Sequence, residues 1–153
     1  MIKNEREYRI TNGEVSRFRQ ALTNLLAQPA TDDPDEQWKR RVFEDAFRSQ
    51  LADLEAEIEE FDRLRVSPPP ALPVASLREL PVALIKARVA AGLTHRELAE
   101  RLGLKEQQLQ RYEATDYESA SLTRLVEVAS ALGVELTGEI TLSKGGHTER
   151  DAA

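Results

Sequence analysis

The chain has 153 residues, enough for one domain of ordinary size or two small ones. Its hydrophobic content of 41% can supply a core, although only 5% of the residues are aromatic. Cysteine is absent, which excludes disulfides, thiol catalysis and cysteine-ligated zinc. No apolar run approaches the roughly 20 residues that a membrane-spanning helix needs, and the polar start does not resemble a signal peptide. We therefore expect a cytoplasmic protein that binds no membrane.

The formal net charge of −6 is spread unevenly along the chain. Residues 1–66 carry 11 basic and 15 acidic side chains, whereas residues 81–135 carry 7 and 8. Nonspecific affinity for nucleic acid comes mainly from lysine and arginine at phosphates, so the acidic total argues mildly against such a partner. The near-neutral second segment would bind DNA only through a few well-placed charges and through dimerisation.

The first half of the chain is expected to be mainly helical. An extended segment is predicted at residues 8–10, followed by a helix that Thr11 caps and that runs to about Gln28. Prolines then interrupt the pattern, and a second helix is predicted from about Asp35 to Arg65. Five apolar residues of this second helix alternate in steps of four and three, as in the seam of a coiled coil: Phe47, Leu51, Leu54, Ile58 and Phe61.

The length of the second helix points to a partner. At about 1.5 Å per residue it would be roughly 45 Å long, so the first helix could cover only part of it. We therefore predict that residues 1–66 form a helical hairpin or coiled coil that dimerises the protein or packs on another chain. The alternative is that the seam docks on the C-terminal part of the same chain. The acidic run at 55–62 is expected to be a solvated helix face, because no histidine accompanies it.

A proline-rich linker is predicted at residues 67–80. The consecutive prolines from Pro68 to Pro70 cannot continue a helix and favour a semi-rigid polyproline II spacer. The segments on either side are therefore expected to be separate units. The second unit begins at Pro81, which suits the first position of a helix that ends at Gly92. The core residues of this helix are expected to be Leu84, Ile85 and Val89.

A pair of short helices joined by a tight turn is predicted between residues 94 and 113. Thr94 is an N-cap, and Glu97 three residues later completes a capping box. Gly103 ends the first helix, because glycine adopts a left-handed conformation without a Cβ penalty. The second helix turns Leu104, Leu109 and Tyr112 inward and its polar side chains outward: Lys105, Gln107, Gln108 and Arg111. This layout is that of a helix-turn-helix, whose second helix presents polar side chains to a DNA major groove.

These residues resemble the lambda-repressor-like, or Cro/C1-type (XRE), DNA-binding domains. The matching positions are Leu93-Thr94, Leu98-Ala99, Leu102-Gly103-Leu104, Leu109, Arg111, Tyr112-Glu113, Leu125, Ala129 and Ala131-Leu132-Gly133-Val134. Their order and spacing are far more specific than a lone helix-turn-helix pattern. The resemblance implies a compact bundle of about five helices that binds operator DNA, usually as a dimer.

The groove-facing positions of the family fall on Lys105, Glu106, Gln107, Gln108 and Arg111. Glutamine can pair with adenine and arginine with guanine, and glutamate can accept from the cytosine amino group, each contributing about 1–3 kcal/mol of discrimination. For Glu106, compensation of the helix dipole is an equal alternative, and for the glutamines the alternative is an ordinary exposed face. In this family the start of the preceding helix approaches a phosphate, which implicates Thr94, His95 and Arg96.

Some neighbouring residues are ambiguous or depart from the family pattern. Arg88 and Arg124 are basic candidates at the rim, but each could as well form an ion pair on a helix surface. After Glu113 the family usually has a glycine and a basic or neutral loop near the DNA backbone. Here Asp116 and Glu118 put two acids in that loop. This departure argues against phosphate contacts from the loop.

The last helix is expected to be capped by Ser119 or Ser121 and to end at Gly133. Its predicted core residues are Leu122, Leu125, Val126, Ala129 and Leu132. Apolar and polar residues then alternate up to residue 143, which predicts one β-strand or two short ones. Such a strand would pair across a two-fold axis or with residues 8–10. Residues 144–153 are expected to be a disordered tail.

The sequence therefore predicts an all-α fold, with an N-terminal hairpin or coiled coil (1–66) and a C-terminal lambda-repressor-like helix-turn-helix bundle with a short terminal strand (81–143). The expected function is a sequence-specific transcriptional regulator, a repressor that binds double-stranded operator DNA as a homodimer. The chain also resembles antitoxins of toxin–antitoxin operons, such as the HigA type, in which case the acidic N-terminal region would bind a basic toxin. The alternative is a protein-interaction module that uses the helix-turn-helix only as a scaffold. No cofactor, metal or enzymatic activity is expected.

Overall fold

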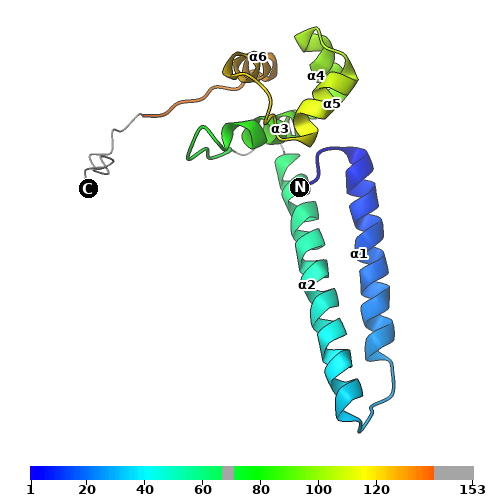
Figure 1. The fold of residues 1–153 in the computed structure, drawn as a ribbon. Coiled ribbons are helices and arrows are strands. Elements are labelled where there is room, and N and C mark those ends of the chain that lie inside the picture. Colours follow the sequence, from blue (N-terminus) through cyan, green and yellow to red (C-terminus); the bar gives the residue numbers. More distant parts are fainter. Residues whose placement is uncertain (67–70, 140–153) are drawn as a thin grey trace, which may run out of the picture.

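The computed structural model describes residues 1–66 and 71–139. Within these residues the chain forms six α-helices and no strand, arranged as a long two-helix hairpin and a compact group of four short helices (Figure 1). The predicted all-α fold with an N-terminal hairpin and a C-terminal helix-turn-helix bundle is confirmed. The proline run at 68–70, the end of the predicted strand at 140–143 and the tail at 144–153 lie outside the described residues.

The first helix, α1 (Glu5–Leu26), begins earlier than expected. Asn4 is its N-cap, and the Asn4 side chain accepts a hydrogen bond of 3.0 Å from the backbone N–H of Glu7. The Glu7 carboxylate in turn accepts from the backbone N–H that precedes the cap, at 2.7 Å. This reciprocal cap replaces the one predicted at Thr11, which lies buried within the helix. The extended segment predicted at residues 8–10 is wrong for the same reason, because those residues are helical.

The second helix, α2 (Pro34–Leu64), matches its predicted extent and runs antiparallel to α1 (Figure 1). Its apolar seam packs on α1. The rings of Phe47 and Phe18 meet edge to face with centroids 6.0 Å apart, and Tyr8 stacks on Phe61 at 5.0 Å. The seam that was expected to bind another chain is therefore covered by α1 of the same chain.

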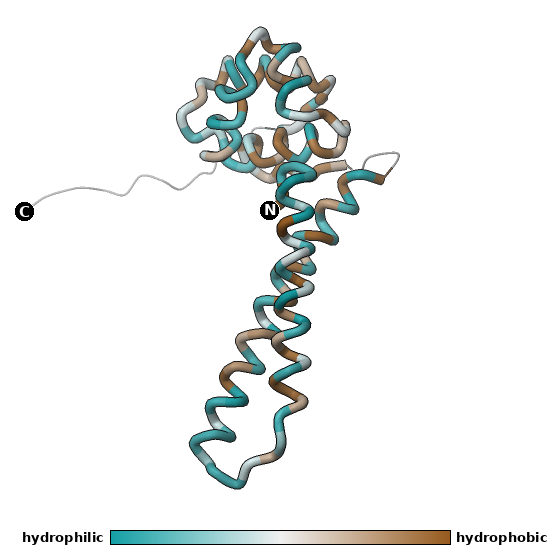
Figure 2. Tube along the Cα trace, turned by 90° about the vertical axis from the view of Figure 1, so that its right-hand side faces the viewer, coloured by the Kyte–Doolittle hydropathy of each residue, from teal (hydrophilic) through white to brown (hydrophobic). Residues whose placement is uncertain are grey.

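The hairpin projects away from the four short helices, as the rotated view in Figure 2 shows. Near its far end the start of α2 leaves several large apolar side chains uncovered. Trp38 is 59% exposed and Phe43 is 55% exposed. Val42 lies between them in sequence and is 45% exposed, and Leu26 at the end of α1 is 46% exposed. Apolar surface therefore remains at the tip of the hairpin and not along its seam.

Four short helices form the bundle: α3 (Leu80–Ala90), α4 (His95–Leu102), α5 (Glu106–Ala114) and α6 (Leu122–Leu132). Each contributes apolar side chains to one shared core. The members of this core that are at most 1% exposed are Leu84, Ile85, Leu98, Ala99, Leu109 and Val128. The core thus fixes the angle at which α5 follows α4.

The buried face of α6 differs from the prediction. Ser121 caps the helix, and its hydroxyl oxygen accepts from the N–H three residues on at 3.2 Å. Leu125 and Val128 are buried, but Leu122 and Val126 are 62% and 56% exposed, so their assignment to the core is wrong. Each residue turns an α-helix by about 100°, which points Val126 away from the core that Leu125 faces. The sequence of α6 is so rich in apolar residues that more than one face of the helix could be buried, and the pattern alone cannot show which one is.

Gly133 ends α6 with φ of +68°, and Val134 after it still packs against the bundle core. Residues 134–139 have no regular secondary structure, so the described part of the predicted strand is not a strand. Its expected partner at 8–10 is helical, which excludes pairing with that segment. A lone extended segment has no ladder to join, and no other strand occurs within 1–66 or 71–139.

A small second core joins the hairpin to the bundle. Ile2, Phe61, Leu64 and Val89 are buried together, and none is more than 6% exposed. The N-terminal ammonium group donates to a carboxylate oxygen of Glu57 at 2.8 Å. The chain start is thus held between α2 and the bundle, and α1 begins at the end of the hairpin that is nearest the bundle (Figure 1). The domain boundaries at residues 67 and 81 stay predictions.

Candidate nucleic-acid interface

The helix α4 starts with the predicted capping box. The Thr94 side chain accepts from the N–H of Glu97 at 3.2 Å, and the Glu97 carboxylate accepts from the N–H of Thr94 at 2.7 Å. The hydrogen bonds from Thr94 lower the pKa of Glu97, so this carboxylate is ionised at neutral pH. Gly103 ends α4 with φ of +65°, and the chain turns directly into α5. Both signals that predicted the turn are therefore present in the structure.

The helix α5 turns one side to the core and the other to solvent. Leu109 and Glu113 are 0% and 1% exposed. The side chains of Gln107, Gln108 and Arg111 are on the other sides of the helix and are exposed in the described structure. Lys105, immediately before the helix, and Glu106, its first residue, are exposed too. The structure therefore brings the predicted groove-facing residues together on one accessible surface.

The glutamines of α5 are not equally free. The side-chain carbonyl of Gln108 accepts a hydrogen bond of 3.0 Å from the backbone N–H of Lys105, which caps the start of the helix. The Gln110 amide donates to Glu106 at 3.0 Å. A bidentate pair with adenine needs both the carbonyl and the amino group of a glutamine. Gln107 has both available within the described chain, whereas Gln108 would first give up its cap.

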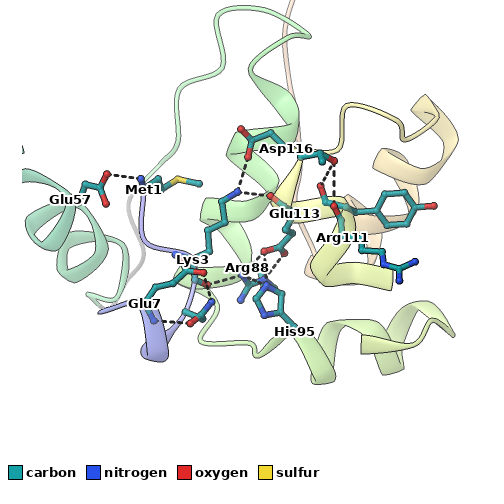
Figure 3. Close-up of polar contacts among 12 residues, drawn as sticks. Met1, Lys3, Glu7, Glu57, Arg88, His95, Arg111, Glu113 and Asp116 are labelled. Atoms are coloured by element: carbon teal, nitrogen blue, oxygen red, sulfur yellow. Dashed lines mark hydrogen bonds and ion pairs between the residues drawn. The ribbon is translucent and has the colours of Figure 1, made fainter. Parts of the chain in front are cut away.

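A buried ion pair lies directly behind α5. The guanidinium of Arg88 in α3 donates to both carboxylate oxygens of Glu113 at 2.6 Å, with side-chain exposures of 2% and 1% (Figure 3). Arg88 also donates to the backbone carbonyls of Leu93 and Lys3, both at 2.8 Å. Arg88 is therefore neither at the rim of the interface nor on a helix surface, where it was expected. It ties α3, the turn before α4 and the N-terminal segment to the last turn of α5.

His95 belongs to this buried network rather than to the exposed start of α4. Its Nε2 atom lies 2.9 Å from the Glu113 carboxylate, and its side chain is 12% exposed (Figure 3). Burial alone would raise the pKa of Glu113, but hydrogen bonds from His95 and Arg88 outweigh it and hold this pKa below its ordinary value. Glu113 is thus an anion that binds the network together.

The N-terminal segment also pairs with one of the two acids in the loop that follows α5. The Lys3 ammonium donates to the backbone carbonyl of Glu113 and to the Asp116 carboxylate, the latter at 2.8 Å (Figure 3). Asp116, one of the two acids that depart from the family pattern, therefore has a cationic partner within the chain. The hairpin side of the protein thereby contacts the end of α5 directly.

The loop after α5 bends without glycine. Asp116 and Tyr117 have φ of 46° and 58°, in the left-handed region that most residues avoid. Tyr117 is 2% exposed and stacks on Tyr112 with ring centroids 5.8 Å apart. Burial of this ring offsets the strain of the two left-handed residues. Tyr112, expected to be core, is half-buried and forms part of this stack.

The remaining basic candidates are on the surface. Arg96 is exposed, and its Nε donates to Glu100 at 2.9 Å. Arg124 pairs with Glu127 at 2.6 Å, the surface ion pair that was its alternative assignment. Arg111 has no acidic partner within the described part of the chain. Arg111 and Lys105 are therefore the exposed cations of α5 and its start that form no ion pair within the described residues.

Sequence patterns missed the network behind α5. Glu113 was matched to the family motif but not recognised as buried, and Lys3 was not considered. One signal was present in the sequence. Glu113 follows the core residue Leu109 by four residues, and Arg88 stands among apolar residues next to Val89. Both charged residues therefore lie on the core-facing sides of their helices. Two opposite charges on facing apolar sides predict a buried pair.

Comparison with known proteins agrees with this geometry. Residues 84–138, from α3 to the segment after α6, match the family model HTH_3, described as Helix-turn-helix. No match was found among curated proteins, and none among solved structures. The family match supports an XRE-like helix-turn-helix and a DNA-binding transcription regulator. No helix of the described residues is long and apolar enough to cross a membrane.

Proposed function

We propose that this protein is a sequence-specific transcriptional repressor that binds double-stranded operator DNA as a homodimer. The observation that carries the proposal is the exposed surface of α5, on which Gln107 and Arg111 stand free while the buried pair of Arg88 and Glu113 holds the helix from behind. Arg111 donates to O6 and N7 of guanine, and Gln107 pairs with adenine. Base contacts need a helix of fixed orientation, which the buried network supplies.

Contacts with the DNA backbone would come from the starts of α4 and α5. At the start of α4 the free backbone N–H groups and the helix dipole favour a phosphate, beside Thr94 and Arg96. His95 contributes its backbone N–H there, because its ring is engaged with Glu113. Lys105 at the start of α5 supplies a cation near the same strand. The charges are few, so affinity depends on binding two half-sites at once.

A dimer interface on α6 suits this function. Leu122 and Val126 lie four residues apart, on one side of α6, and are more than half exposed. A two-fold axis must hold the two α5 helices about 34–36 Å apart, one turn of the duplex. An interface within the bundle fixes that spacing, whereas one at the tip of the hairpin would leave each bundle at the end of a long arm. We therefore assign the α6 face to a second copy of this chain.

DNA binding tests the proposal directly. Duplexes enriched from a random-sequence pool by the wild-type protein should bind in a salt-sensitive manner, and Arg111→Ala should weaken their binding by about 1–3 kcal/mol. Arg41→Ala is the charge-matched control, because Arg41 is exposed on the hairpin. A shallow dependence on salt with no effect of Arg111→Ala would instead favour a protein-interaction module with the helix-turn-helix as scaffold.

The dimer assignment has its own test. Val126→Glu should turn the dimer into a monomer by light scattering and weaken operator binding, because the two half-sites are no longer bound together. Phe43→Glu at the hairpin tip is the matched control and should leave both unchanged. If the protein stays dimeric with Val126→Glu but becomes monomeric with Phe43→Glu, the dimer interface is at the hairpin tip and not on α6.

A second candidate function is supported by the tip of the hairpin. Trp38, Val42 and Phe43 form exposed apolar surface on an otherwise acidic unit, which suits a basic protein partner such as the toxin of a toxin–antitoxin operon. In that case the protein is an antitoxin that represses its own operon. Co-expression with the product of the neighbouring gene tests this: Phe43→Glu should abolish co-purification and Val126→Glu should not. Absence of any such complex with the wild-type protein would exclude the antitoxin role for that pair.

A further inference from the structure

A groove runs between the start of α1 and the helix-turn-helix. It has a volume of about 820 Å³, and its walls include Arg6 and Arg9 from α1, Thr94 from the start of α4, and Glu106 and Gln110 from α5. The groove therefore has the candidate phosphate-binding helix start on one side and two arginines of the hairpin on the other. Those arginines lie outside residues 84–138, the part of the chain that matches the family model.

The two arginines are available for a ligand. Both are exposed, and neither forms an ion pair within the described residues. Arg6 and Arg9 are three residues apart, so their side chains leave the same side of α1. Arg17, eleven residues after Arg6, continues this side, because eleven residues complete about three helical turns. Arg9 makes one internal contact, from Nε to the backbone carbonyl of Glu5 at 3.4 Å, which leaves its terminal nitrogens free.

The acids near the arginines are engaged elsewhere. Glu5 pairs with Arg65 of α2, and Glu7 accepts from the backbone N–H of Lys3 at 2.7 Å as part of the α1 cap. Glu106, on the opposite wall, accepts from the Gln110 amide at 3.0 Å. Five basic and four acidic side chains line the groove, so its lining carries a small net positive charge, although residues 1–66 as a whole are acidic.

The start of α1 is fixed relative to α5 rather than tethered loosely to it. Ile2 is 3% exposed in the second core, and the Lys3 carbonyl accepts from Arg88 at 2.8 Å. Lys3 also bonds the loop after α5 through Asp116. Arg6 follows in the first turn of α1. Because the backbone that carries Arg6 and Arg9 is already ordered, only their side chains lose conformational entropy when they contact a ligand of α4 and α5.

We propose that Arg6 and Arg9 bind phosphates of the same duplex that α5 contacts, so that the hairpin extends the DNA-binding surface beyond the helix-turn-helix. The proposal rests on the proposed function and adds a second element to it. Phosphate contacts carry no base information, so these arginines raise affinity for all duplexes alike. They also supply positive charge that the near-neutral bundle lacks.

The experiment measures binding as a function of salt concentration. Fluorescence anisotropy would compare the wild-type protein with the double variant Arg6→Gln and Arg9→Gln, on a duplex enriched from a random-sequence pool and on a scrambled duplex. Log K falls with log salt, and each phosphate contact contributes about 0.9 to the steepness of that fall. The double variant should therefore make the salt dependence shallower by about 1.8 on both duplexes. The ratio of the two affinities should not change.

Two controls separate this proposal from the proposed function. Lys39→Gln with Arg41→Gln removes the same charge from exposed positions at the far end of the hairpin and should leave the slope unchanged. Arg111→Ala should reduce the affinity ratio between the two duplexes. If Arg111→Ala does so while the Arg6 and Arg9 variant keeps the wild-type slope, or binds more tightly, the hairpin contact is wrong and the proposed function stands. If no variant alters binding, both the hairpin contact and the proposed function are wrong.

Discussion

The Arg88 guanidinium and the Glu113 carboxylate form two hydrogen bonds of 2.6 Å at a place where neither side chain is more than 2% exposed. The pair connects α3 to the last turn of α5, and Lys3 and His95 attach the N-terminal segment and α4 to the same point. A buried pair of this kind is a poor source of net stability but is costly to break from one side. Its place behind the exposed surface of α5 holds that helix in a fixed orientation.

Removing one partner of this pair should strongly destabilise the protein. Glu113→Ala leaves the Arg88 guanidinium buried without its anion, and we expect the free energy of unfolding to fall by about 3–5 kcal/mol in urea denaturation. Glu100→Ala is the matched control, because Glu100 pairs with Arg96 in the open and its loss should cost less than about 1 kcal/mol. Equal losses in the two variants would contradict a buried, desolvated pair.

The same pair predicts a dependence of stability on pH. The pKa of Glu113 is lowered from 4.5 in the folded protein, with hydrogen bonds from His95 and Arg88 outweighing burial. A carboxyl with a depressed pKa stabilises the fold above its unfolded pKa, and this contribution is lost as the pH falls through the folded value. The difference in unfolding free energy between the wild type and Glu113→Gln should therefore shrink as the pH is lowered below about 4.5. A difference that stays constant with pH would show that Glu113 does not titrate in this way.

Tyr117 offers a stabilising substitution. Its hydroxyl group is buried and has no hydrogen-bond partner within the described residues, and burial, followed by the charge of Glu113, raises its pKa. Tyr117→Phe keeps the ring that stacks on Tyr112 and removes the unsatisfied group, so the melting temperature should stay the same or rise, with a gain of up to about 1–2 kcal/mol. Tyr117→Ala should instead lose about 3–5 kcal/mol. A destabilised Tyr117→Phe would indicate a bound water on the hydroxyl group.

Local signals in the sequence predicted the structure correctly where a backbone feature depends on one residue or on close neighbours. The capping box of Thr94 and Glu97 and the left-handed turn at Gly103 depend on nearest neighbours, and both were predicted. The start of α1 was missed because two caps compete, and the reciprocal bonds of Asn4 and Glu7 prevail over the cap at Thr11. An N-cap signal was present at both positions, so the choice between them needed the reciprocal partner to be recognised.

Tertiary relationships were harder to predict. The apolar seam of α2 and its partial coverage by the first helix were predicted, but α1 begins earlier than expected, at Glu5, so that Tyr8 also reaches Phe61. The exposed side of α6 at Val126 and the buried charge of Arg88 both reverse the expectation from residue type. In each case the side chain's environment is set by an element distant in sequence, which periodicity does not record.

The two adjacent glutamines of α5 should behave differently when truncated. Gln107→Ala removes a free amide from the exposed surface, so unfolding free energy should not change while discrimination at an adenine falls by about 1–3 kcal/mol. Gln108→Ala removes the cap on the Lys105 N–H and should lower stability by about 0.5–1 kcal/mol, with the smaller effect on base preference. Thermal unfolding and binding to a panel of single-base variants of the enriched duplex measure both quantities. If Gln108→Ala lost more discrimination than Gln107→Ala, the cap would have to open on binding, and Gln108 would be the adenine contact.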